Sequence, residues 1–376
     1  MKRSVVLVAG VAALVASLAL IGVEVRRERE FRRLIAVGDA ARAGGEASEA
    51  IEAFSGALAF KPEAMLAHLK RGETYLRRGE LAAALRDLTE ASRLDPTAPL
   101  PLERLGDVHA AMGRHADASR HYQQYVALDD RAPRVLYKLA LSQYQGGRTD
   151  LALAAVERTL VLDESLPEAH YLRGMVLRAA NRTPEAITAL QRAIALNPAF
   201  GAAREELAGY YAQLGRRRDS IEQLEAVAAL QTQRPEPLVR VALAYARLGR
   251  LDSAIATLGR AAERDRQSPV VYTALGRVWL DAAEATSDRA SLRKALEALR
   301  AVAPRPGATS ETLTLYGRAL LLAGDVAGAE QTLEEATNRL PVESVAFKYL
   351  GDAATRLGHA ASAREAALRY TALTGT

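Results

Sequence analysis

The sequence predicts an all-α fold, an α-solenoid of about ten helix-turn-helix repeats preceded by a single transmembrane helix. Three observations predict the repeats. The apolar pattern recurs every 34 residues, two places in each period hold only small residues, and prolines fall only in closing turns or in the first turns of helices. A fourth observation, an apolar run near the N-terminus, predicts the membrane helix.

The stretch 167–200 shows the repeat most clearly. One amphipathic helix is predicted from about residue 167 to 180, and a second from about residue 183 to 196, where Asn197-Pro198 ends it. Two such short helices form a hairpin that cannot bury both of its apolar faces alone. The hairpin therefore needs neighbours of the same kind.

Periods of 34 place repeats near residues 31, 65, 99, 133, 167, 201, 235, 269, 310 and 344. The eighth position is always Gly or Ala, in the series Gly38, Gly72, Gly106, Ala140, Gly174, Ala208, Ala242, Gly276, Gly317 and Gly351. The twentieth is always Ala or Ser, and a bulky residue usually follows four places later, as at Phe54, Leu88 and Tyr122. We expect these bulky residues to pack against the small ones.

Prolines test the register independently. A proline inside a helix costs roughly 3 kcal/mol, so a wrong register would place several of them in helix interiors. All fourteen prolines lie in the turn that closes a repeat or in the first turn of a helix.

The period, the small residues and the closing prolines together resemble the tetratricopeptide repeat family. The resemblance covers residues 31–376 and implies a right-handed solenoid whose first helices line a concave, protein-binding face. The sixth copy is the least regular, because it combines Arg204 at the fourth position with Ala208 and Ser220. We expect a looser interface there.

One insertion interrupts the period. The hairpin that starts near residue 269 holds seven extra residues, near 282–291. Seven residues are close to two helical turns, so both helices could lengthen by about one turn and keep their faces in phase. The insertion is either a tolerated loop extension or a protruding contact.

The N-terminal segment has three parts. Residues 1–4 form a basic tail, residues 5–25 are predicted to form a transmembrane helix or uncleaved signal anchor, and residues 26–33 form a basic juxtamembrane segment. The uninterrupted apolar run spans residues 5–23. A cleavable signal peptide is the alternative, but no small-x-small site follows the run.

Charge around the run predicts its orientation. More arginines follow it than basic residues precede it, which favours a single-pass protein of the bacterial inner membrane with cytoplasmic repeats. The periplasmic orientation is the alternative.

Composition and motifs exclude several function classes. The chain has no cysteine, and its net charge of +5 is dispersed, so a nucleic-acid partner is not expected. The densest basic run of the repeats, residues 216–218, falls in an inter-helix turn and is interpreted as a solvated loop. No nucleotide-binding, metalloprotease or nucleophile-elbow motif is present, which predicts a protein without catalysis, cofactor or metal.

The family resemblance implies which residues face the groove. The residue after each small eighth position points into it, and this series runs from acidic through apolar to basic side chains. Apolar and aromatic residues suit anchoring of a peptide, and cations suit its carboxylates. The predicted peptide groove comprises Tyr137, Lys138, Leu141, Tyr144, Tyr171, Met175 and Arg178. The predicted basic groove end comprises Arg240, Arg247, Arg277 and Arg318.

Two functions fit this sequence. The first is a membrane-tethered scaffold that binds peptide segments or partner proteins in its groove. The second is a structural or assembly subunit buried in a permanent membrane complex. Apolar residues of the last helix, Leu368, Tyr370 and Leu373, favour the second function or self-association, because no polar capping helix follows them.

Overall fold

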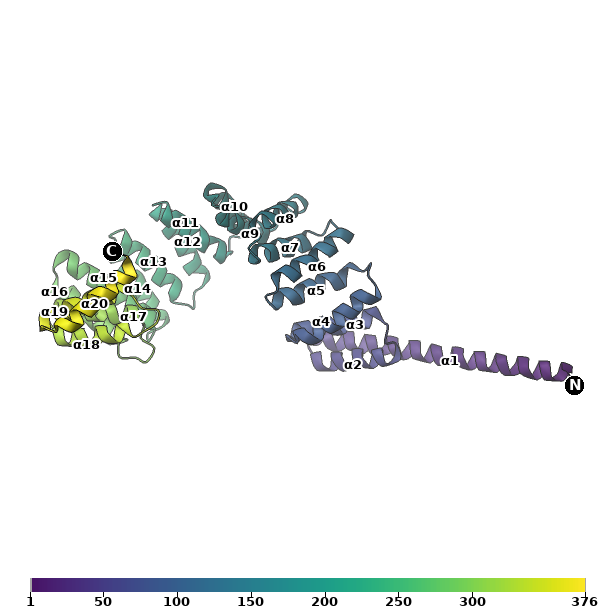
Figure 1. Cartoon of the computed structure of the whole chain (residues 1–376). Coiled ribbons are helices and arrows are strands. Elements are labelled where there is room, and N and C mark those ends of the chain that lie inside the picture. The colour runs from purple at the N-terminus through teal and green to yellow at the C-terminus, as the bar shows by residue number, and fades with distance from the viewer. Residues whose placement is uncertain (1, 376) are drawn as a thin grey trace. The chain divides into compact units, whose positions relative to one another are not determined.

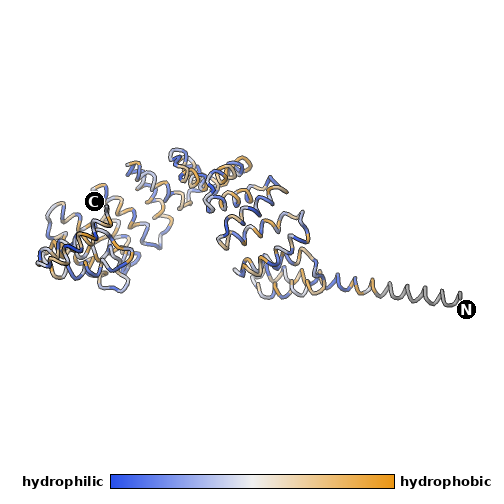
Figure 2. The backbone as a smooth tube through the Cα atoms, in the orientation of Figure 1, coloured by the Kyte–Doolittle hydropathy of each residue, from blue (hydrophilic) through white to orange (hydrophobic). Residues whose placement is uncertain are grey.

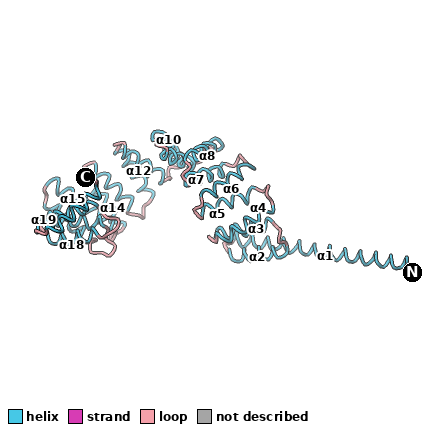
Figure 3. Tube along the Cα trace, viewed as in Figure 1, coloured by secondary structure: helices cyan, strands magenta, loops and turns pink. Residues whose placement is uncertain are grey.

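A computed structural model describes the backbone of residues 2–375 and the side chains of residues 20–375. The described chain folds into twenty helices joined by turns, with no strand among residues 2–375 (Figures 1 and 3). It forms two compact units, Met1–Leu196 and Asn197–Thr376. Each unit holds ten helices, paired as hairpins, so the predicted all-α repeat architecture is confirmed.

The first unit stacks five hairpins, each made of an odd-numbered first helix and an even-numbered second helix. Its helices are α1 (Lys2–Ala43), α2 (Ala47–Phe60), α3 (Met65–Arg78), α4 (Leu81–Leu94), α5 (Pro99–Ala111), α6 (His115–Leu128), α7 (Pro133–Gln145), α8 (Thr149–Leu162), α9 (Pro167–Ala179) and α10 (Thr183–Leu196).

The second unit repeats the scheme. Its helices are α11 (Gly201–Gln213), α12 (Arg217–Leu230), α13 (Glu236–Arg247), α14 (Leu251–Arg264), α15 (Pro269–Thr286), α16 (Arg289–Arg300), α17 (Ser310–Ala323), α18 (Val326–Thr337), α19 (Ser344–Leu357) and α20 (Ala360–Thr374). In both units the coloured parts of the helices carry both hydrophobic and hydrophilic residues, as expected of helices with one buried face (Figure 2).

Each hairpin is closed by one recurring contact. The bulky side chain of the second helix lies directly over the small eighth residue of the first helix. A Cβ added at Gly72 would lie 2.8 Å from Leu88 Cγ, and one added at Gly174 would lie 2.9 Å from Leu190 Cγ. The same overlap occurs in the pairs Gly38–Phe54, Gly106–Tyr122, Gly276–Leu299 and Gly317–Leu333. The predicted packing of bulky on small residues is confirmed at these hairpins.

The turn between the two helices of a hairpin requires a left-handed residue. Glycine fills this place in most hairpins, for example Gly79 with φ 77°. In the fifth hairpin the residue is Asn181, with φ 59°. Asparagine is one of the few residues other than glycine that adopts this conformation readily.

Polar residues at the fourth position make a shared contact. His68 Nε2 lies 2.9 Å from the Pro62 carbonyl oxygen, and Arg204 Nε donates to the Pro198 carbonyl at 2.9 Å. Both partners lie six residues earlier, in the turn that closes the preceding repeat. The irregular Arg204 therefore binds the closing turn as a histidine does, and the two compact units divide just before it, between Leu196 and Asn197.

The inserted residues lie at the tip of the eighth hairpin. Helix α15 continues ten residues past Gly276, whereas α9 continues five past the equivalent Gly174. Helix α16 starts six residues before Ala295, whereas α10 starts three before the equivalent Ala186. Asp288 caps α16, because its carboxylate accepts hydrogen bonds from the backbone N–H groups of Ala290 and Ser291.

Helix α1 combines the N-terminal segment and the first helix of the first repeat without a break. Residues 20–27 are exposed, and from about residue 34 the helix packs on α2. The predicted membrane segment, residues 5–23, lies largely outside the residues whose side chains are described. Within the described part, no helix combines the length and the apolar character that crossing a bilayer requires.

We expect Gly106→Ala to lower the free energy of unfolding by about 1–3 kcal/mol. The new methyl group would lie within 2.7 Å of Tyr122 Cζ, and that ring is held by the hydrogen bond from its hydroxyl to Asp107. Gly259→Ala is the matched control, because a Cβ there meets no atom within 4 Å. It should raise stability by up to about 1 kcal/mol through helix propensity. Urea unfolding followed by circular dichroism measures both, and equal effects would contradict the packing argument.

Candidate functional site

The predicted peptide groove lies on two neighbouring first helices of the first unit. Helix α7 carries Tyr137, Lys138, Leu141 and Tyr144, and α9 carries Tyr171, Met175 and Arg178. All of them are half-buried except Arg178, which is exposed. The structure therefore brings the predicted residues to one region of one unit.

Part of this cluster also serves the core. Tyr137, Leu141 and Tyr144 pack against the buried cluster that includes Leu139 and Val156. Burial raises the pKa of the Tyr137 hydroxyl, and the nearby Glu168 carboxylate and Tyr171 raise it further. Tyr137 and Tyr144 thus contribute to the core and keep part of their surface accessible.

A regular ladder of ion pairs runs across the first helices of this unit. In the first three repeats the acidic ninth residue binds the basic sixth residue of the next repeat. Lys70 Nζ lies 2.7 Å from Asp39 Oδ1, and Arg104 Nε lies 2.8 Å from Glu73 Oε1. The third ion pair of the ladder joins Lys138 Nζ to Asp107 Oδ1 at 2.8 Å. The acidic residues that the sequence placed at one end of the groove are therefore compensated within the chain.

Lys138 itself is fully engaged. Its ammonium group also donates to Glu103 Oε1 at 2.6 Å. Asp107 in turn accepts a hydrogen bond of 2.7 Å from the buried Tyr122 hydroxyl, whose pKa is raised by burial and by that carboxylate. Lys138 was predicted to bind a carboxylate of a partner, but here it binds two carboxylates of its own chain.

The predicted basic groove end lies in the second unit, where three of its four arginines are paired. Arg240 Nη2 lies 2.5 Å from Glu205 Oε1, and Arg277 Nη2 lies 2.5 Å from Glu311 Oε1. Arg318 pairs with Glu284. Arg247 is exposed and has no partner among the described residues.

Arg247 lines a half-open cavity of about 600 Å³. It lies between α11, the start of α12 and α13, and we call it the basic cavity. Small and apolar residues form its floor, and arginines stand around it. The residues that define it are Ala208, Gly209, Arg217, Leu224, Arg240, Leu243 and Arg247.

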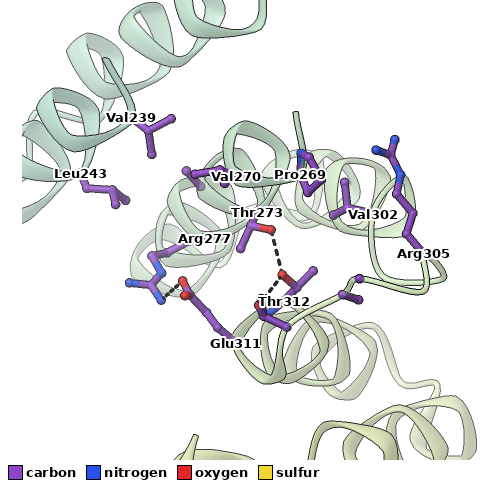
Figure 4. A pocket seen from close by; sticks show the side chains of 14 residues that line it. Val239, Leu243, Pro269, Val270, Thr273, Arg277, Val302, Arg305, Glu311 and Thr312 are labelled. Atoms are coloured by element: carbon purple, nitrogen blue, oxygen red, sulfur yellow. Dashed lines mark hydrogen bonds and ion pairs between the residues drawn. The ribbon is translucent and has the colours of Figure 1, made fainter. Parts of the chain in front are cut away.

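A second cavity of about 400 Å³ adjoins the basic cavity, since Leu243 lines both. It is lined by α13, α15, α17 and the long connection before α17 (Figure 4). Its walls are mainly apolar, and we call it the apolar pocket. The residues that define it are Val239, Leu243, Val270, Thr273, Val302, Ala308 and Thr312.

The threonine hydroxyls of the apolar pocket contact one another. The Thr273 and Thr312 hydroxyl oxygens lie 2.9 Å apart, and Thr312 also contacts the Thr309 hydroxyl at 3.0 Å (Figure 4). The ion pair of Arg277 and Glu311 closes one edge. What remains for a ligand is apolar surface.

Histidines form one close pair in the first unit. The rings of His109 and His121 stack with centroids 5.1 Å apart, and burial lowers the pKa of both. Among the residues with described side chains, no group of three His, Asp or Glu could hold a metal ion.

Sequence reasoning missed both cavities. It interpreted Arg217 as part of a solvated loop, whereas this residue is the first of α12 and lines the basic cavity. The series of residues that follow the small eighth positions includes Gly209, and the sequence analysis drew nothing from its missing side chain. The available signal was that Gly209 alone lacks a side chain in that series.

Comparison with family models gives one consistent result. A model described as "Tetratricopeptide repeat" matches residues 36–99, 103–167 and 206–269. Two other models with the same description match residues 167–200 and 310–335. Comparison with curated proteins gave no match.

Solved structures with similar folds include the C-terminal part of a TPR repeat-containing protein from Cytophaga hutchinsonii. It is 15% identical over 66% of this chain and 98% of that chain, with a TM-score of 0.55. Yeast Tom70 is 13% identical over 93% of each chain, with a TM-score of 0.48. YrrB, described as a TPR protein with an unusual peptide-binding site, is 21% identical over 48% of this chain and 94% of its own, with a TM-score of 0.42. At these identities the similarity concerns the fold alone.

We expect Lys138→Met to destabilise the first unit by about 1–2 kcal/mol, because Glu103 and Asp107 lose a partner in a half-buried setting. The loss should shrink in 1 M salt, where repulsion between the two carboxylates is screened. Lys348→Met is the matched control, since Lys348 is exposed and has no ion pair among the described residues. Thermal unfolding at low and high salt measures both. A loss that salt leaves unchanged would contradict the electrostatic explanation.

Proposed function

Because the chain belongs to the tetratricopeptide repeat family, we propose that it is a non-enzymatic scaffold that binds protein partners through peptide segments laid against its first helices. The observation that carries the proposal is the pair of adjoining cavities in the second unit. First helices line both of them, and the chain's own side chains leave both open. Open cavities with apolar floors and a few polar groups are the usual form of ligand sites.

The first unit offers a second surface for the same function. Tyr137, Tyr171 and Met175 are half-buried, so each retains some accessible surface beside the ion-pair ladder. Aromatic side chains of this kind contribute strongly to binding, because they bury much area with little loss of conformational entropy. Lys138 stays with its own carboxylates in this proposal, and the aromatic rings supply the contact.

We further propose that residues 5–23 tether the chain to a bacterial membrane. The support is the length and apolar character of that run in the sequence, followed by five arginines within residues 26–33. A tether would confine partners to two dimensions beside the bilayer. The excess of positive charge after the run favours cytoplasmic repeats.

A specific observation supports the alternative, a subunit buried in a permanent complex. On α20 only Ala366 is buried, while Leu368 and Leu373 are 72% and 54% exposed. In the alternative function a partner, or a second copy of the chain, covers this face. The two functions differ in where the main contact lies.

Site-specific photo-crosslinking in native membranes separates them. A photo-reactive amino acid at Leu141 should capture partners if the scaffold function holds, and the double change Tyr137→Ala and Tyr171→Ala should abolish most of that capture, because the aromatic anchors are lost. The double change to Phe keeps the rings and should retain capture. The same probe at Leu368 reports the alternative. Near-complete crosslinking from Leu368, with none from Leu141 and none from the same probe at Leu243, which lines both cavities, would replace the scaffold by the buried subunit.

A topology reporter tests the tether. Green fluorescent protein fused after Thr376 should fluoresce and sediment with membranes, because cytoplasmic repeats keep the fusion where that reporter folds. Alkaline phosphatase at the same place should stay inactive. Active phosphatase would instead indicate periplasmic repeats. Fluorescence in the soluble fraction would contradict the proposed membrane tether.

A further inference from the structure

The basic cavity carries an excess of positive charge that the chain does not neutralise. Three arginines, Arg217, Arg240 and Arg247, line it together with one acid, Glu205. Glu205 binds Arg240 and its pKa is lowered mainly by that hydrogen bond, against the opposing effect of burial. Arg217 and Arg247 have no partner among the described residues. Two guanidinium groups are therefore available to an anion.

The floor of this cavity is open because of its own sequence. Gly209 stands where the neighbouring repeats carry Met175 and Leu243, and a Cβ added there meets no atom within 4 Å. The bulky second-helix residue of this hairpin, Leu224, is only half-buried, whereas its counterparts Leu190 and Leu258 are fully buried. Backbone and apolar surface thus lie accessible between the arginines.

The apolar pocket, on the other side of Leu243, limits which side chain of a ligand can bind there. Its lining is mainly apolar and its threonine hydroxyls already contact one another, so a polar group entering it would replace few of the hydrogen bonds that it makes to water. An apolar side chain would instead gain contacts with Val239, Val270 and Val302.

From these two neighbouring cavities we infer that the second unit binds a partner segment that places a carboxylate in the basic cavity and a large apolar side chain in the apolar pocket. The inference rests on the proposed scaffold function and names the chemistry of the segment. Arginine binds carboxylates with two parallel, charge-assisted hydrogen bonds, which suits Asp and Glu side chains. The apolar side chain, on the other side of Leu243, fixes register and direction.

The test uses the full chain in mild detergent and a phage library of random 12-residue peptides. Enriched peptides should combine Asp or Glu with Leu, Phe or Trp within a few residues. A fluorescein-labelled copy of an enriched peptide is then titrated by fluorescence anisotropy. Replacing its acidic residues by Gln or Asn, or its large apolar residue by Ala, should each weaken binding about tenfold or more.

Two variants locate the site. Gly209→Leu fills the floor of the basic cavity and should abolish binding, while Gly259→Leu makes the same change at an exposed helix position whose Cβ also meets no atom within 4 Å and should leave binding unchanged. The double change Arg217→Gln and Arg247→Gln removes two exposed cations that have no ion pair among the described side chains. This double change should weaken binding of the acidic peptide about tenfold. The variant should then bind the Gln or Asn form of the peptide as well as it binds the acidic form.

Three results would overturn the inference. Enriched peptides without acidic residues would show that the bound segment needs no carboxylate. Equal binding to the Gly209→Leu variant and to the unchanged protein would show that the peptide binds outside the basic cavity. Equally tight, arginine-dependent binding of a 12-residue oligothymidine would show a general polyanion site. In the first two cases peptide binding itself stands, so the scaffold function survives. If no peptide is enriched, this inference fails, and crosslinking from Leu141 decides the function separately.

Discussion

The fold depends on one contact, made once per hairpin between a bulky side chain of the second helix and a small residue of the first. At Gly174 the helix backbones approach so closely that a methyl group would lie 2.9 Å from Leu190 Cγ. The same close approach occurs at the eighth position of six hairpins, and that position is Gly or Ala in every repeat. In the tenth hairpin the contact is looser, since the nearest atom to a Cβ at Gly351 is Ala366 Cβ, at 3.7 Å. That hairpin ends in α20, the helix with a single buried residue.

Sequence periodicity was sufficient for the repeats because this contact and the turns are local. The two residues in contact lie within one hairpin, sixteen residues apart in the regular repeats. Aligning the repeats and comparing the residues at each position is therefore enough to identify both. The left-handed turn residue is equally regular and could have been predicted from its glycines. Asn181 shows how the signal survives a substitution, because asparagine satisfies the same backbone requirement.

The candidate site was harder to predict because it arises between repeats. The ion pairs join the ninth residue of one repeat to the sixth of the next, so a list of ninth residues alone suggested an acidic surface where Asp39, Glu73 and Asp107 are in fact compensated. The apolar pocket depends on the long connection that carries Val302 and Ala308, and no periodic pattern specifies that conformation. The charges were visible in the sequence, but their partners were not.

This pairing explains why the second unit has the stronger site. In the first unit Lys138, the cation predicted for the groove, binds two carboxylates of its own chain, so the aromatic side chains are the groove residues that remain for a partner. The ninth positions at the basic cavity are Gly209 and Leu243, neither of which can form an ion pair of the ladder. Arg240 pairs with Glu205 instead, and Arg217 and Arg247 have no ion pair among the residues whose side chains are described. An interruption of internal pairing and a missing side chain thus occur at one place, and together they leave both charge and space for a partner.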